Sequence, residues 1–145
     1  MSERIGHVFL LSCTLALCGC AKEPTTPTIL EASSNPYVSD LPLPINFKLE
    51  DHQSEDKVSA GHRSVKHVYR GKEKLQAVKN FYQHYMPQAN WAPVEHSLSR
   101  GVYLLKYRKG RERCDVRIER MPSGLFGTVT QIRATILHDN AEMPG

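Results

Sequence analysis

The chain has 145 residues, of which 40% are hydrophobic and 23% are charged, and its net charge at neutral pH is +4. This length allows one modest domain and excludes a two-domain dehydrogenase, a kinase or a (β/α)₈ barrel. The ordinary hydrophobic and charged fractions indicate that most of the chain folds.

The chain starts with the features of an export signal. Arg4 and the terminal amine precede Val8–Leu17, a run of ten residues without charge. A helix needs about 20 apolar residues to cross roughly 30 Å of hydrocarbon, so this run is too short for a permanent membrane span. Residues 1–19 are therefore predicted to be a signal peptide.

The four residues Leu17-Cys18-Gly19-Cys20 resemble the lipobox of bacterial lipoproteins. The resemblance implies that the Cys20 thiol receives a diacylglycerol and that the signal is cut just before it. Two or three acyl chains hold a protein stably on a membrane. In a cell with two membranes, Ala21 after the cysteine implies the outer membrane, facing the periplasm. The alternative is an ordinary signal cut near Ala21, with an incidental Cys20.

Cysteine usage suits an exported domain without disulfides. If Cys13 and Cys18 leave with the signal and Cys20 carries lipid, Cys114 is the remaining thiol of the mature chain. We expect Cys114 to be a small buried hydrophobic side chain. A catalytic thiol is the alternative, although no cysteine-protease signature surrounds it.

The segment after the signal is predicted to be a flexible tether. Residues 20–44 contain the lipidated cysteine, five of the nine prolines and many small polar residues, without apolar periodicity. This composition favours an extended, mobile chain. The folded domain is then expected to cover residues 45–138, with residues 139–145 as a C-terminal tail.

Two strands and one helix are predicted in the first half of this domain. Apolar residues alternate with polar ones in Ile45–Leu49, and Val65–Tyr69 is a second β-like run. Between Lys72 and Met86, apolar side chains recur at helical intervals. Pro87 is expected to end this helix after Met86.

Four more strands are predicted after the helix: Trp91–Leu98, Val102–Lys109, Cys114–Ile118 and Thr128–Leu137. Pro93 confines the first of them to a sheet edge or a bulge. Gly110 suggests a hairpin, and Pro122–Gly127 supplies a turn. The order β-β-α-β-β-β-β predicts an α+β domain, in which an antiparallel sheet of about four to six strands carries one amphipathic helix on one face.

Several core and turn residues resemble those of a family of small bacterial lipoproteins with no assigned activity. The matching strings include Phe81-Tyr82-x-x-x-Met86-Pro87-x-x-x-Trp91 and Leu105-x-Tyr107-x-Lys109-Gly110. That family usually has glycine just before the tryptophan, where this chain has Asn90. Asparagine tolerates a left-handed backbone nearly as well. The resemblance implies the fold and gives no chemistry.

No residue pattern indicates catalysis, a metal or a cofactor. The histidines lack the i, i+4 pairing of a zinc protease, and the acidic stretch Glu50–Asp56 lacks the calcium-loop pattern. We therefore expect no catalytic residue, metal site or cofactor. The alternative is a small exported hydrolase, or a ligand- or metal-binding domain with a pocket between helix and sheet. There His67 or His84 would meet Glu95 or Asp115.

Positive charge is uneven along the chain. Seven Lys or Arg residues lie between Lys57 and Lys79, and eight lie between Arg100 and Arg120. Such stretches form solvated faces or contact anionic surfaces. The candidate contacts with an anionic surface or a partner are Lys106, Arg108, Arg111 and Arg113.

Together these patterns predict a non-enzymatic envelope protein that is held on the membrane by its N-terminal lipid. Its α+β domain is expected to act as a binding or interaction module for an envelope protein or an anionic envelope polymer. Nucleic acid is not expected as a partner of an exported protein. An uncovered face of the sheet also leaves a homodimer open.

Overall fold

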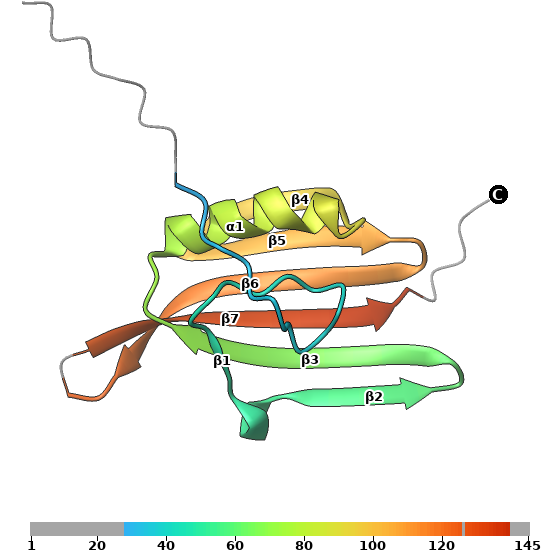
Figure 1. Cartoon of the computed structure of the whole chain (residues 1–145), viewed down its shortest axis with the longest axis horizontal. Helices are drawn as coiled ribbons and strands as arrows, with labels where there is room; N and C mark the ends of the chain where they lie inside the picture. Colours follow the sequence, from blue (N-terminus) through green and yellow to red (C-terminus); the bar gives the residue numbers. More distant parts are fainter. Residues whose placement is uncertain (1–27, 126, 140–145) are drawn as a thin grey trace, which may run out of the picture.

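The computed structural model describes residues 28–125 and 127–139. In this part of the chain, seven strands form one antiparallel sheet in the order β1-β3-β7-β6-β5-β4, with β2 also paired to β3 (Figure 1). The elements are β1 (Lys48–Leu49), a 3-10 helix (Asp51–Gln53), β2 (Glu55–Ser59), β3 (His62–Gly71), α1 (Leu75–Gln88), β4 (Ala92–Ser99), β5 (Val102–Lys109), β6 (Glu112–Ser123) and β7 (Gly127–His138). The predicted α+β class is confirmed.

The sheet contains one strand more than the sequence predicted. β2 has five residues, all of them exposed, so it carries no alternation of apolar and polar side chains. Backbone pairing with β3 defines this strand, from Glu55 opposite Lys66 to Ser59 opposite His62. β6 also runs through the predicted turn at Pro122 and ends at Ser123.

Helix α1 packs its apolar stripe on β4, β5 and β6. Val78, Phe81, Tyr82 and Met86 are its buried side chains. The helix continues through Pro87 to Gln88 instead of ending at Met86, because the last turn closes through other amides. The amide of Ala89 donates to Tyr85 O at 3.1 Å, and that of Trp91 donates to Met86 O at 3.0 Å. Asn90 has a φ of 65°, so the expected left-handed conformation is confirmed.

The segment before β1 packs on the sheet, which corrects the predicted tether for residues 28–44. Leu41 and Leu43 are 1% and 3% exposed and belong to the hydrophobic core, and Leu30 and Val38 pack against it. Backbone hydrogen bonds join Ser33 N to Leu43 O and Ile45 N to Glu31 O, at 2.8 and 2.9 Å. Apolar burial outweighs the conformational freedom that the prolines suggested. The predicted signal peptide and Cys20 lie outside the described residues.

The sheet therefore has a covered face and an open face. The covered face carries α1 and the segment before β1, and it buries Leu105, Val116, Ile118, Ile132 and Ile136. The alternate side chains, including Lys106, Asp115, Arg117 and Arg133, lie on the open face in register across neighbouring strands. Among the described residues, no helix is long and apolar enough to span a bilayer.

The sheet has free edges at both sides. β4 forms one edge, and the register shifts between Pro93 and Glu95. The predicted effect of Pro93 is thus confirmed in both of its forms, edge and bulge. β1 and β2 lie along the other edge, outside β3.

Candidate functional site

A pocket lies at the corner of the sheet where β1 meets the end of β3. In Figure 1 this corner of the sheet lies toward the left. Its volume is about 460 Å³, within the range of ~300–1,000 Å³ that is usual for small-molecule sites. The lining residues are Asn46, Lys48, Arg70, Gly71, Lys72, Glu73 and Val129. We call this site the basic pocket, because Lys and Arg contribute three of the lining side chains and an acid only one.

A close contact between the Phe47 ring and Gly71 lies next to the basic pocket. Asn46 has a left-handed backbone with a φ of 68°, just before Phe47. Phe47 packs so closely on Gly71 that a Cβ atom there would lie 2.7 Å from the Phe47 ring. Glycine is required at this position because any side chain would displace the ring. The contact fixes β1 against the end of β3.

Two cations face each other at the mouth of this pocket. Lys48 lies directly opposite Arg70 in the register of β1 and β3, and like charges at such positions destabilise a sheet. Nε of Arg70 is buried and has no hydrogen-bond partner among the described residues. Oε1 of Glu50 lies 3.9 Å from this nitrogen, which is too far for a hydrogen bond. The charge of Arg70 is thus only weakly compensated.

The two lysines of the lining have no ion pair in the described part of the chain. Lys48 and Lys72 are exposed and form no ion pair with another described residue. Glu73 uses its backbone carbonyl to accept a hydrogen bond from the Thr130 hydroxyl. The basic pocket can therefore offer several cationic donors to one bound anion.

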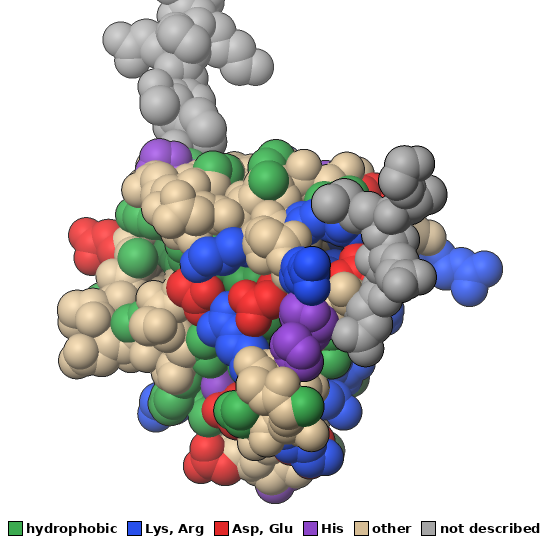
Figure 2. All heavy atoms as spheres, turned by 90° about the vertical axis from the view of Figure 1, so that its right-hand side faces the viewer, with side chains coloured by type: hydrophobic (Ala, Val, Ile, Leu, Met, Phe, Trp, Pro, Cys, Tyr) green, Lys and Arg blue, Asp and Glu red, His purple; other side chains and the backbone are tan. Residues whose placement is uncertain are grey.

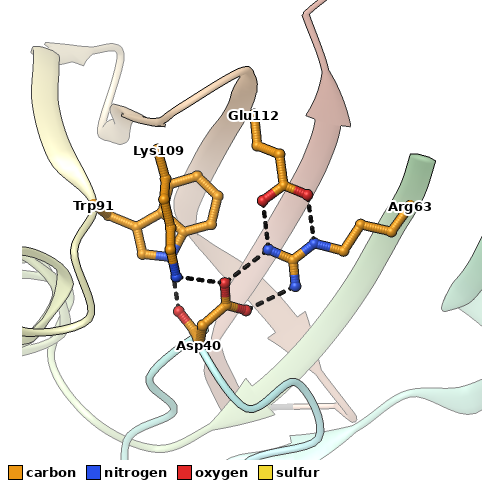
Figure 3. A network of polar contacts seen from close by, with 5 residues as sticks. All are labelled: Asp40, Arg63, Trp91, Lys109 and Glu112. Atoms are coloured by element: carbon orange, nitrogen blue, oxygen red, sulfur yellow. Dashed lines mark hydrogen bonds and ion pairs between the residues drawn. The ribbon is translucent and has the colours of Figure 1, made fainter. Parts of the chain in front are cut away.

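The opposite end of β3 holds a network that we call the charge clamp, formed by Asp40, Arg63, Lys109 and Glu112 (Figure 3). Arg63 donates to both Asp40 oxygens at 2.8 and 2.7 Å and to both Glu112 oxygens at 2.6 and 2.7 Å. Lys109 Nζ donates to Asp40 at 2.8 Å. The hydrogen bonds from Arg63 and Lys109 hold the pKa of the Asp40 carboxyl well below its usual range. Two cations and two carboxylates neutralise each other here.

Trp91 ties this clamp to the core. Its indole nitrogen donates to the backbone oxygen of Asp40 at 2.7 Å, and Lys109 Nζ lies 5.5 Å from the centre of its ring. Figure 2 shows this end of the molecule, where red and blue side chains alternate beside a purple pair of histidines. The rings of His62 and His138 stack there, with centroids 3.7 Å apart.

A buried histidine connects two other polar side chains. Nδ1 of His67 lies 2.7 Å from the Tyr69 hydroxyl, and its Nε2 lies 2.8 Å from Oδ1 of Asp56. His67 and Tyr69 are 3% and 1% exposed, so a substrate has no access to them. Burial raises the pKa of the Tyr69 hydroxyl, which keeps it neutral. These contacts join β2 to the core.

The alternative pocket between helix and sheet does not form from the predicted residues. Asp115 lies on the open face, and Glu95 accepts a hydrogen bond from Lys106 at 2.6 Å. His67 lies on the covered face with Asp56, and the His84 ring packs edge-on against Tyr85. The space between α1 and the sheet is filled by buried aromatic and aliphatic side chains.

Three of the four predicted contact residues come together on the open face. Arg108 lies directly opposite Arg113, and Lys106 lies opposite Asp115. Arg111 is exposed in the hairpin between β5 and β6. Acids accompany the other three: Lys106 binds Glu95 and Arg108 binds Asp139, at 2.6 and 2.7 Å, and Arg113 lies 3.6 Å from Asp115.

Cys114 is fully buried and free, as expected for a small hydrophobic side chain. Burial raises the pKa of its thiol, so it remains protonated and unreactive. Among the described residues, no three His, Cys, Asp or Glu side chains lie together as a metal site.

The sequence analysis missed the basic pocket, although Arg70 and Lys72 belong to the first of its two basic stretches. The pocket depends on Lys48, which reaches Arg70 only through the pairing of β1 with β3. A signal was present in Gly71, which ends the β-like run. A glycine at the end of a strand often marks a close approach of another segment.

A sheet with one helix, a buried core and a basic pocket defines a small α+β protein. A comparison of the chain with models of known protein families gave one match. Residues 52–131, more than half of the chain, match the START domain-like family, and the chain belongs to this family. START-like domains are generally binding modules rather than enzymes.

The match begins after β1, so Lys48 and the packed N-terminal segment lie outside it. Searches among curated proteins and among solved structures found no match to the chain. The resemblance to small bacterial lipoproteins remains a prediction from the sequence.

Proposed function

We propose that this protein is a lipid-anchored, non-enzymatic binding module of the bacterial cell envelope and that it holds an anionic ligand in the basic pocket. The observation that carries the proposal is the placement of Arg70. Its Nε is buried without a hydrogen-bond partner in the described part of the chain, and Lys48 lies directly opposite Arg70. An anion between these two side chains would relieve their repulsion and supply the missing acceptor.

A binding role suits the side chains at this site. Its lining consists of cations, one amide, one acid and the apolar groups of Gly71 and Val129. No serine, cysteine or histidine belongs to the described lining. The chemistry available is therefore recognition of charge and shape, in agreement with the family.

The proposed location rests on the lipobox-like residues. Cys20 is the proposed lipid attachment site, and Ala21 favours the outer membrane, facing the periplasm, in a cell with two membranes. We test this anchor with Cys20→Ser, which should release the protein from membranes and remove the lipid mass from the intact-mass spectrum. Cys18→Ser is the matched control, because serine is common at that lipobox position, and it should keep both. Retention of lipid and membrane association by Cys20→Ser would overturn the anchor.

Anion binding is tested by thermal unfolding in phosphate, sulfate and acetate at constant ionic strength. A ligand that binds only the folded state raises the melting temperature. The increase should disappear in the double variant Lys48→Gln/Arg70→Gln. It should persist in Lys66→Gln/Arg100→Gln, which removes two exposed charges outside the pocket lining. An equal response of both variants to every anion would sink the proposal.

The open face supports a second candidate function, the docking of a protein with an acidic surface. Arg108 lies directly opposite Arg113, and Arg117 lies opposite Arg133. Acids lie between these cations, so the mixed surface suits a folded partner with complementary charges better than a uniformly negative polymer.

This second function is tested by crosslinking in living cells with a photoreactive residue in place of Leu137, which is 37% exposed. Substitution of Lys106, Arg108, Arg111 and Arg113 by Gln should remove the crosslinked product while the melting temperature falls only slightly, because the ion pairs that are lost are partly exposed. The same substitution of Lys66 and Arg100 should keep it. A product that survives the first set of substitutions would exclude the open face as the docking surface.

A further inference from the structure

We infer that the ligand of the basic pocket is an acidic α-amino acid, a molecule with two carboxylates and one ammonium group. This inference rests on the proposed function, because it requires that the pocket binds anions. Three observations carry it: an unpaired acid among the cations, the balance of charge in the lining, and the size of the pocket.

Glu73 lies among the cations of the basic pocket without pairing with any of them. Its carboxylate forms no ion pair with another described residue, although Lys48, Arg70 and Lys72 line the same pocket. Glu73 is half-buried, and its backbone is held in place because its carbonyl accepts a hydrogen bond from the buried Thr130 hydroxyl. Opposite charges at one site are thus kept apart instead of neutralising each other.

This arrangement disfavours a ligand that carries only negative charge. An anion that contacts Arg70 and Lys48 also lies in the field of the Glu73 carboxylate, and like charges that are partly removed from water repel each other. An ammonium group on the ligand that faces Glu73 turns this repulsion into an attraction. Charges of both signs in one pocket therefore select a ligand that also carries both.

The balance of charge favours a ligand with more negative than positive groups. The lining contains three cations and one acid. A neutral amino acid would supply one carboxylate for the three cations, whereas an acidic amino acid supplies two. The side-chain amide of Asn46 has no hydrogen-bond partner within residues 28–125 and 127–139, so it can donate to the second carboxylate. The planar guanidinium of Arg70 matches the two oxygens of the first.

The size of the pocket suits a molecule of this kind. One water molecule takes up about 30 Å³ of liquid, so a pocket of about 460 Å³ is much larger than a single small anion needs. The volume lies in the lower half of the usual range for organic ligands. Val129 and Gly71 provide apolar lining, against which the methylene groups between the two carboxylates can lie.

The test is calorimetric titration of the protein purified from cells in nonionic detergent, at neutral pH and physiological salt, which screens weak surface attraction. The ligands are L-glutamate, glutarate and L-glutamine. Glutarate keeps both carboxylates and lacks the ammonium group, and glutamine keeps the ammonium group and lacks the second carboxylate. We expect saturable binding of glutamate, and binding of the other two that is weaker by about tenfold or more.

Three variants separate the roles of the charges. Glu73→Gln keeps the shape of the side chain and should reduce the preference for glutamate over glutarate to about twofold or less, because the ammonium group loses its charged partner. Lys48→Gln/Arg70→Gln should weaken the binding of all three ligands by about tenfold or more. The matched control Lys66→Gln/Arg100→Gln lies outside the lining and should change the affinity for glutamate by less than about twofold.

The outcomes separate this inference from the proposed function. A preference for glutamate that depends on Glu73, Lys48 and Arg70 supports the inference. Equal binding of glutarate or of glutamine overturns it, as does a preference that persists in Glu73→Gln. The absence of glutamate binding also overturns it. In each of these cases a pocket-dependent response to simple anions in the thermal test would leave the proposed function standing, and the lack of such a response would remove both.

Discussion

The two ends of β3 carry the same kinds of charged side chain in opposite states. At its start, Arg63 is shared between Asp40 and Glu112, and Lys109 adds a second cation to Asp40. At its end, Arg70 faces Lys48, and no carboxylate of residues 28–125 or 127–139 lies within hydrogen-bond distance of it. The first arrangement uses charge to hold the fold together. The second leaves charge available for a ligand, at a cost to the fold.

Removal of the central acid of the charge clamp should have the largest effect on stability. Asp40→Ala leaves Arg63 and Lys109 with Glu112 as the remaining carboxylate of the clamp, and should lower the free energy of unfolding by about 2 kcal/mol. Urea denaturation measures this change. Glu55→Ala is the control, because its ion pair with Lys57 is exposed and is worth less than about 0.5 kcal/mol. Equal costs would mean that the clamp is no more than a surface pair.

Adding a methyl group at Gly71, beside the basic pocket, should lower the free energy of unfolding by somewhat less than Asp40→Ala does. Gly71→Ala pushes against the Phe47 ring and should destabilise the protein by about 1.5 kcal/mol. It should also weaken anion binding, because β1 must shift. The smaller side chain of Phe47→Leu should reduce the cost of Gly71→Ala in a double-mutant cycle by urea denaturation. If the costs of the two substitutions simply add, the close contact between Gly71 and Phe47 is contradicted.

Lowering the pH should remove the stability that the charge clamp contributes, because Asp40 becomes protonated. The folded-state pKa of Asp40 lies below its ordinary value, while an unfolded Asp titrates near 4. The unfolded chain therefore takes up a proton first as the pH falls. The stability from this group is complete above about pH 4 and is lost progressively below it. Urea midpoints between pH 6 and pH 2 should show a shallower decline for Asp40→Asn than for the wild type, whereas Arg70→Gln should follow the wild type.

The smallest expected changes in stability come from replacing one lysine at each end of β3, and the two changes should have opposite signs. Lys48→Gln removes one of two facing cations and should stabilise the ligand-free protein by about 0.3 kcal/mol. Lys109→Gln removes a partner of Asp40 and should destabilise it by about 1 kcal/mol. Urea denaturation at low salt measures both, and added salt should reduce the gain from Lys48→Gln. A loss of stability in both variants would contradict the view that the cations of the basic pocket repel each other while those of the charge clamp are neutralised.

The sequence predicted the parts of this fold that depend on local patterns. The stripe that includes Val78 and Tyr82 recurs at helical intervals, and Val116 and Ile118 alternate with charged residues. Asn90 and Pro93 act through their own backbone, so their effects could also be inferred. These signals lie within short windows of the chain.

The packed N-terminal segment and the basic pocket could not be predicted in this way. Leu41 and Leu43 stand among prolines without a periodic pattern, and only the sheet beneath them shows why they are buried. Asp40 and Glu112 meet at Arg63 from distant parts of the chain. Lys48 and Arg70 are likewise joined by strand pairing alone. Long-range register decided both sites, and the local signal at Gly71 marks a close approach without identifying the partner strand.

The two free edges of the sheet bear on how the protein behaves at high concentration. An open edge offers unpaired backbone groups to another molecule and can seed fibrils. β4 counters this with Pro93 and its register shift, because proline lacks an amide proton and a bulge breaks the repeat. β2 counters it with Glu55, Asp56 and Lys57, which are all exposed. Concentrated protein should therefore resist amyloid-like growth, even though the sheet is not closed into a barrel.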